Sequence, residues 1–125
     1  MKDKYILTAE SVTAGHPDKL CDTIADNVLD ACLKEDPNAR VACEVLATAG
    51  KILVAGELRT TASPDVEAIV RQIVQNAGYD CNYNVEVRLH TQSPDIAGAV
   101  DGETLGAGDQ GIMYGYACWE TVELL

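Results

Sequence analysis

Apolar residues recur every three or four positions in two stretches of the chain, and this spacing predicts two amphipathic helices. The first extends from Pro17 to about Glu35. The second is opened by a cap, a proline and an early acid, Ser63-Pro64-Asp65, and ends at about Ala77. Gly78 suits the position after the second helix because glycine adopts positive φ without strain. The apolar stripes that should pack on the core contain Leu20, Ile24, Val28, Ala31 and Cys32 in the first helix, and Val66, Ile69, Val70, Ile73 and Val74 in the second.

Shorter stretches are rich in β-branched residues or alternate between apolar and polar positions, and they predict strands. A Gly-rich, acidic segment from Ala97 to Gly108 precedes the last strand, and we expect it to be a mobile loop. The elements follow the order β-α-β-β-α-β-loop-β in a single domain of 125 residues. This order predicts an α+β fold with two helices on one face of a mostly antiparallel sheet. The predicted strands are Lys4–Thr8, Arg40–Thr48, Lys51–Thr60, Tyr83–Leu89 and Gly111–Ala117.

Ala49-Gly50 separates the second and third strands, and a two-residue loop that ends in glycine predicts a tight hairpin. Thr48 then pairs with Lys51, and the register continues to Ala42 opposite Glu57. One face of this hairpin is entirely apolar and should face the core: Val41, Cys43, Val45, Ala47, Ile52, Val54, Gly56 and Leu58. The other face mixes apolar and charged residues: Ala42, Glu44, Leu46, Thr48, Lys51, Leu53, Ala55, Glu57 and Arg59.

The mixed face of the hairpin admits two interpretations. An antiparallel sheet can expose one face to water, and a few acids would then be solvated there. However, the apolar residues of this face are poorly suited to water, and its two acids, Glu44 and Glu57, stand diagonally with roughly 7–8 Å between their Cα atoms. Such a face is better explained as a covered surface, for example a subunit interface with a site at its rim.

The chain is strongly acidic, with 20 Asp and Glu against 9 Lys and Arg and a formal net charge of −11. This balance argues against nucleic-acid binding, which needs clustered cations, and against binding to an anionic membrane surface. No apolar run is long enough to span a bilayer and the first residues lack the apolar core of a signal peptide, so we expect a cytoplasmic protein. Five cysteines without a C-x-x-C pair indicate reduced, mostly buried thiols rather than a zinc site.

The stretch from Glu10 to Asp30 concentrates the candidate chemistry. Proline fits the first helical position because its φ is preset and it has no N–H, so the first helix should begin at Pro17, with His16 extended in front of it. An imidazole, the Asp18 carboxylate and the unpaired amides of a helix N-terminus then lie within one turn, and such a site suits an anion and its metal. Simple complementarity with the helix dipole explains Asp18 equally well.

Residues 106–111 match the dinucleotide-binding pattern G-x-G-x-x-G letter for letter. The pattern binds a pyrophosphate only where a strand precedes it and a helix follows it. Here a loop precedes the pattern and a predicted strand follows it, so we reject a dinucleotide-binding site.

Four segments of the chain resemble signature sequences of the N-terminal third of S-adenosylmethionine synthetase, also called methionine adenosyltransferase. They are ESVTAGHPDKLCDTIADNVLD, ARVACEVLATAGKILVAGEL, QSPDI and GAGDQGIMYGYA, and the resemblance extends from about Tyr5 to Ala117. It implies a transferase in which methionine sulfur attacks C5′ of ATP and expels the triphosphate, which is then hydrolysed to pyrophosphate and phosphate. It also implies Mg²⁺ and K⁺ as cofactors.

The resemblance implies roles for individual residues. His16 would be catalytic, near the leaving triphosphate oxygen and thus ATP-binding, and Glu10 would lie near the nucleotide. Asp18 would bind Mg²⁺, and Glu44 would bind K⁺. The family's mobile loop, which closes over the site, corresponds to residues 97–108. The residues that match those holding methionine are Glu57, Gln92 and Asp109.

The resemblance further implies a site built between two subunits whose sheet faces meet, so we expect a homodimer or a homologous partner. The loop is shorter than usual here, Thr104-Leu105 replaces the family's common Glu-Gln, and Lys19 is the one cation near the His16 turn. Full-length members are longer, and their other parts supply the lysines, an arginine and further acids around the triphosphate. We therefore expect a chain that is inactive alone. The alternatives are a complementing subunit of a split synthetase, or a non-catalytic module for Mg-nucleotide binding or dimerisation.

Overall fold

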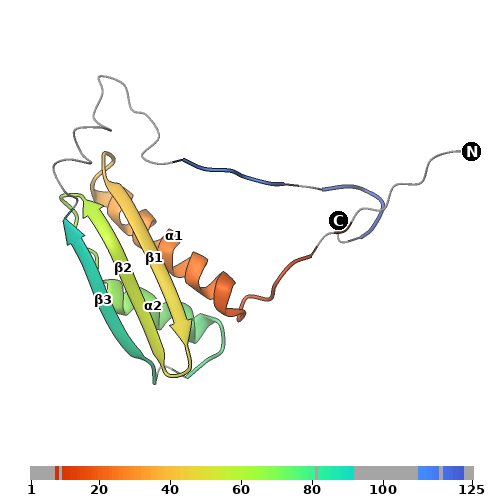
Figure 1. Cartoon of the computed structure of the whole chain (residues 1–125), viewed down its shortest axis with the longest axis horizontal. Coiled ribbons are helices and arrows are strands. Elements are labelled where there is room, and N and C mark those ends of the chain that lie inside the picture. The colour runs from red at the N-terminus through yellow and green to blue at the C-terminus, as the bar shows by residue number, and fades with distance from the viewer. Residues whose placement is uncertain (1–7, 9, 81, 92–109, 116, 123–125) are drawn as a thin grey trace, which may run out of the picture.

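The computed structural model describes residues 8, 10–80, 82–91, 110–115 and 117–122. Two helices pack on one face of a three-stranded sheet, and within these ranges no helix covers the other face (Figure 1). The predicted α+β class is confirmed, and the five elements follow the predicted order. They are α1 (Pro17–Glu35), β1 (Arg40–Thr48), β2 (Lys51–Arg59), α2 (Val66–Asn76) and β3 (Asn84–Thr91).

Helix α1 begins at Pro17, as the sequence predicts, whereas α2 begins at Val66 with Asp65 as its N-cap, so Asp65 is not the early acid of the first turn that the sequence pattern predicted. Pro17 opens α1, and the N-cap residue His16 has extended backbone angles (φ −64°, ψ 137°), which the residue before a proline favours. The side chain of Asp65 caps α2 by accepting a hydrogen bond from the Ala68 N–H (3.0 Å). Neither helix of the described ranges is long and apolar enough to cross a membrane.

The hairpin of β1 and β2 has the predicted register, with Thr48 opposite Lys51 and Ala42 opposite Glu57. Its loop contains Gly50 at φ 71°, a conformation that glycine adopts without strain. Because Glu44 pairs with Ala55, the two acids Glu44 and Glu57 are diagonal neighbours on the face away from the helices, as predicted.

The sheet is mixed, so the prediction of a mostly antiparallel sheet is wrong for the second strand pair. β2 and β3 are parallel, with Ile52 opposite Val85 and Glu57 opposite His90. The physical reason is the connection, because α2 crosses from the end of β2 back to the beginning of β3, and a crossover helix joins parallel neighbours. Alternation along β3 shows which side chains share a face, but it contains no information on the direction of the strand.

Two further strands are predicted from the sequence, and neither is confirmed. The prediction at Gly111–Ala117 is wrong for the described residues, because 111–115 and 117 form no strand. Ile112, Met113 and Tyr114 are at least 79% exposed. A sequence that favours strands is not stabilised as a strand when no neighbouring strand packs against it. The predicted strand Lys4–Thr8 lies outside the described residues except for Thr8, and the predicted loop at 97–108 lies wholly outside them.

The core between the sheet and the helices is aliphatic. Ile24, Val28, Ile52, Val54 and Val70 are fully buried, and each such side chain contributes about 1.5–3 kcal/mol when it leaves water. The half-buried residues Val41, Cys43, Val45 and Ala47 pack against this core, which confirms the predicted apolar face of the hairpin. The core therefore holds α1 against β1 and β2, and it fixes the position of the turn that precedes α1.

Candidate functional site

A tight turn in front of α1 carries His16 and Asp18, the two residues that the sequence singles out first. The His16 N–H donates to the Thr13 carbonyl (3.0 Å), so residues 13–16 reverse the chain before the helix. The His16 carbonyl then accepts a hydrogen bond from the Leu20 N–H (2.9 Å). The two side chains are therefore brought together at the N-terminus of α1, where the helix dipole favours negative charge.

One nitrogen of the His16 ring belongs to the helix cap. Nδ1 accepts a hydrogen bond from the Asp18 N–H (3.2 Å), so the neutral ring carries its proton on Nε2. Nδ1 lies 3.9 Å from Asp18 Oδ2, which is too long for a hydrogen bond. The side chains are 43% and 85% exposed, so water screens this pair and it contributes little stability. The turn thus offers a ligand one N–H donor, at His16, and one carboxylate, at Asp18.

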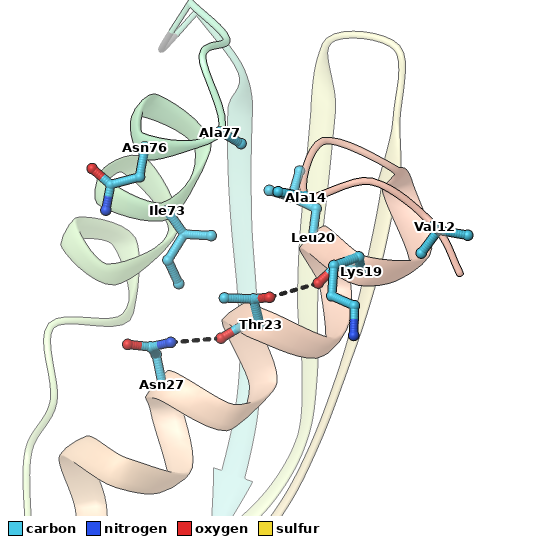
Figure 2. A pocket seen from close by; sticks show the side chains of 9 residues that line it. All are labelled: Val12, Ala14, Lys19, Leu20, Thr23, Asn27, Ile73, Asn76 and Ala77. Carbon is cyan, nitrogen blue, oxygen red and sulfur yellow. Dashed lines mark hydrogen bonds between the residues drawn. The ribbon is translucent and has the colours of Figure 1, made fainter. Parts of the chain in front are cut away.

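A cavity of about 460 Å³ adjoins this turn. In Figure 2 the segment with Val12 and Ala14 and the first turns of α1 form one side, and the end of α2 forms the other. Thr23 donates to the Lys19 carbonyl (2.7 Å) and Asn27 donates to the Thr23 carbonyl (2.8 Å), so both polar side chains are paired within α1. Of the described residues, Lys19 is the one charged group in the wall, so no carboxylate there could bind a cation.

The face of the sheet without helices carries the second set of candidate residues. Glu57 of β2 lies between Ala42 of β1 and His90 of β3, and Glu44 lies opposite Ala55. Glu44 and His90 are exposed and Glu57 is half-buried. His90 is on the polar face of its strand. Its position opposite Glu57 depends on the parallel register, so the sequence pattern did not reveal it.

A network of three charges occupies the same face nearer the hairpin loop. Glu86 of β3 accepts hydrogen bonds from Lys51 of β2 (2.5 Å) and from Arg88 (2.8 Å). Both hydrogen bonds lower the pKa of Glu86 below its ordinary value, and the bond from Lys51 has the larger effect. Sequence reasoning missed this network because Lys51 reaches Glu86 only when β3 lies parallel to β2. The one available signal was the position of Glu86 and Arg88 on the polar side of their strand.

The described residues contain no group of three His, Cys, Asp or Glu side chains that could hold a metal ion. Mg²⁺ is commonly held by one or two carboxylates together with substrate phosphates and water. Asp18, whose side chain is 85% exposed, fits that use. Glu44 is exposed on a different part of the structure and could offer one carboxylate to a separate cation. The described residues therefore suit a cation that is bound partly by substrate phosphates and water better than a cation that is enclosed by protein ligands alone.

The structure gathers four of the predicted site residues into two separate groups. His16 and Asp18 share the turn before α1, whereas Glu44 and Glu57 lie across the sheet, on the face without helices (Figure 1). Glu10 belongs to neither group and is exposed in the segment that leads to the turn, whereas Gln92 and Asp109 lie outside the described residues.

The cysteines of the described ranges are free thiols, as the sequence predicts; they are Cys21, Cys32, Cys43 and Cys118. Burial, with the nearby Glu44 carboxylate as a smaller cause, raises the pKa of Cys43 to about 11. Burial also raises the pKa of Cys21 and of Cys32 above the ordinary value. These thiols stay protonated at neutral pH, so they are poor nucleophiles and poor metal ligands.

Comparison with known proteins gives consistent matches. Residues 4–103 match the family model described as S-adenosylmethionine synthetase, N-terminal domain. The chain is 48% identical to the S-adenosylmethionine synthase of Treponema denticola over 98% of its own length and 36% of that protein, and 50% identical to the one of Granulibacter bethesdensis over 100% and 35%. A solved structure of an unusual S-adenosylmethionine synthetase from Campylobacter jejuni superimposes with a TM-score of 0.67 and 38% identity, covering 74% of this chain and 28% of that one. The chain thus spans about a third of the length of its curated relatives.

Proposed function

Because this chain belongs to the S-adenosylmethionine synthetase family and matches the family's N-terminal domain, we propose that it supplies part of a site that makes S-adenosylmethionine from ATP and methionine. In the proposed reaction methionine sulfur attacks C5′ of ATP, and the expelled triphosphate is hydrolysed to phosphate and pyrophosphate. The observation that carries this proposal is the turn before α1, in which an imidazole N–H and a carboxylate meet the N-terminus of a helix.

The turn suits the leaving triphosphate. Because Nδ1 of His16 accepts a hydrogen bond from the Asp18 N–H, the proton on Nε2 is available to a triphosphate oxygen. The helix N-terminus also favours the negative charge of the triphosphate. Glu10 is proposed to lie near the nucleotide. When bound, Mg²⁺ beside Asp18 and K⁺ beside Glu44 would supply positive charge as the leaving group develops negative charge.

The sheet face suits methionine. A carboxylate is a natural partner for the substrate's ammonium group, and Glu57 is a half-buried carboxylate at the end of the strand pair. Gln92 and Asp109 are proposed to complete the methionine site together with Glu57. Residues 97–108 are proposed to close over the site and exclude water.

The separation of the two groups supports a site shared between two copies of the chain. His16 and Asp18 belong to one side of the sheet, and Glu57 and Glu44 belong to the other, so one copy would supply the first pair and its partner the second. The shared face also exposes apolar surface, since the Leu46 side chain is 62% exposed. We therefore propose a homodimer that forms through the open sheet face.

The dimer is tested by light scattering at micromolar concentration. Leu46→Asp should convert a dimer to a monomer because it introduces a charge into the proposed interface. Leu33→Asp is the matched control, because Leu33 is a partly exposed leucine on α1, away from that face. A monomer for the unaltered chain, or equal effects of the two substitutions, would contradict the proposed interface.

The scarcity of cations supports the proposal that these 125 residues are inactive by themselves. Lys19 is the one Lys or Arg between residues 5 and 33, and the whole chain has nine. Stabilising a triphosphate leaving group requires preorganised positive charge, and acidic residues with one imidazole supply little of it. The net charge of −11 argues against a nucleic-acid partner and against an anionic membrane surface, and a cytoplasmic location is part of the proposal.

A second candidate fits the same scarcity of cations: a complementing subunit that works when another chain supplies the remaining parts. A non-catalytic module that binds Mg-nucleotide or dimerises is the other alternative. Activity after mixing with the remaining parts would distinguish the first of these from the second.

Calorimetry with Mg-ATP tests the role of the turn. We expect binding to the unaltered chain, and Asp18→Asn should weaken it by at least about tenfold because it removes a metal ligand. Asp26→Asn is the matched control, since it makes the same change of charge at an exposed position of α1. Absence of Mg-ATP binding, or an equal loss in both variants, would contradict the proposed site.

A further inference from the structure

The end of α2 fixes the backbone of Tyr79. Gly78 has φ 89°, which lets the chain leave the helix in the left-handed conformation. The Gly78 N–H donates to the Gln75 carbonyl (2.9 Å), and the Tyr79 N–H donates to the Val74 carbonyl (3.2 Å). These two bonds are those of a Schellman motif, in which the residue after the glycine has a defined direction.

The Tyr79 side chain joins this helix end to the turn before α1. Its hydroxyl donates to the Gly15 carbonyl (2.8 Å), between residues that are 64 positions apart in the sequence. A Cβ atom on Gly15 would lie 3.2 Å from the Tyr79 hydroxyl oxygen and 3.3 Å from its ring carbon Cε2. The ring therefore packs directly on the glycine backbone, and the missing side chain at residue 15 permits this approach.

Gly15 is the anchored point of an otherwise exposed segment. Residues 10–14 and 16 are exposed, and Gly15 is half-buried. It lies between Thr13 and His16, whose backbone hydrogen bond closes the turn. A contact that holds the Gly15 carbonyl in place therefore also restricts the orientation of His16 and of the first turn of α1.

We propose that Tyr79 is a positioning residue: by holding the Gly15 carbonyl, it orders the turn that presents His16 and Asp18 to the Mg-triphosphate. This inference rests on the proposed function of the turn. Tyr79 does not contact the reacting groups, and it acts through Gly15. Its phenol is suited to this task because the ring packs on the turn while the hydroxyl remains within reach of the carbonyl.

Tyr79→Phe removes the hydroxyl and keeps the ring. Tyr83→Phe is the matched control, because Tyr83 lines the same small cavity of about 190 Å³ beside Gly15 and Pro17. The first readout is amide hydrogen exchange of His16, measured by NMR. We expect Tyr79→Phe to accelerate it by about two- to twelvefold, the range that corresponds to a typical net hydrogen bond, whereas Tyr83→Phe should leave it unchanged.

The second readout is Mg-ATP affinity, which a purely structural role would not alter. Tyr79→Phe should weaken binding by a factor in the same range, with the exchange of the Ile24 amide in the core of α1 unchanged. Gly15→Ala adds a methyl group against the Tyr79 ring, so it should likewise accelerate His16 exchange and weaken Mg-ATP binding. Unchanged His16 exchange in Tyr79→Phe overturns the anchoring, and faster exchange with unchanged affinity overturns the positioning role. Failure of the unaltered chain to bind Mg-ATP contradicts the proposed function, and the exchange rates still decide whether Tyr79 holds the turn.

Discussion

Gly56 of β2 is the position at which one added methyl group should disturb the sheet most. It lies next to Glu57 and opposite Cys43 of β1, and its φ is 141°. A Cβ atom at this position would lie 2.0 Å from the Ala42 carbonyl oxygen and 3.0 Å from its carbonyl carbon. Both atoms belong to the backbone of β1, so no side-chain rotation could relieve the contact.

The cost of Gly56→Ala has two parts. Holding a non-glycine residue in a sparsely populated backbone region costs of order 1–3 kcal/mol. To lengthen the 2.0 Å contact to 3.0 Å, β1 would have to move by about 1 Å, which weakens its ladder with β2. Each hydrogen bond lost from the ladder costs about 1 kcal/mol, so the loss of about two bonds brings the total to about 3–5 kcal/mol. That is a large share of the roughly 5–15 kcal/mol by which small proteins are stable.

Urea unfolding followed by circular dichroism measures this loss. The control is Gly50→Ala in the hairpin loop, where φ is also positive (71°) but no atom lies within 4 Å of the added Cβ. This control should lose only about 1–2 kcal/mol, the cost of the left-handed conformation alone. If the two variants lost equal stability, the close approach of β1 to Gly56 would not be a determinant of the fold.

Three further predictions concern the core, a capping aspartate and a half-buried thiol. Ile24→Ala should destabilise the chain by about 2–5 kcal/mol in the same urea assay, because Ile24 is fully buried, and a loss below 1 kcal/mol would contradict the packing. The hydrogen bond from the Thr61 N–H lowers the pKa of Asp36, so its stabilising effect is present above the ordinary pKa of 3.8 and is lost as the pH falls through the lowered value. Asp36→Asn should therefore reduce the drop in urea midpoint between about pH 5 and about pH 3, and an unchanged drop would refute this. Because the pKa of Cys43 is about 11, iodoacetamide at about pH 8 should modify Cys43 in urea but not in the folded chain, as mass spectrometry would reveal.

The features predicted correctly from the sequence have local causes. Pro17 fixes the start of α1 because its ring presets φ and removes a donor, and both effects act within one residue. The two-residue loop at Ala49-Gly50 sets the register of the whole hairpin, including the diagonal placement of Glu44 and Glu57. The resemblance of short segments to a family then indicated which of these residues could form a site.

The features that the sequence did not reveal depend on distant parts of the chain. The parallel direction of β3 follows from the path of the crossover through α2, and it places His90 beside Glu57. The hydrogen bond from Tyr79 to Gly15 joins positions 64 residues apart, and no local pattern records it. The segment at 111–115 has the composition of a strand, but a strand also needs a neighbour, and the described residues provide none there.

The central claim is that the turn before α1 is one part of a synthetase site that needs the remaining parts. The direct measurement is S-adenosylmethionine formation from ATP and methionine with Mg²⁺ and K⁺. It would be made for a polypeptide of these 125 residues alone, and for the same polypeptide mixed with one carrying the rest of the Treponema denticola synthase. We predict no product from the polypeptide alone and product from the mixture, abolished by Asp18→Asn and retained with Asp26→Asn. Turnover by the polypeptide alone, or equal activity of the two variants in the mixture, would contradict this account.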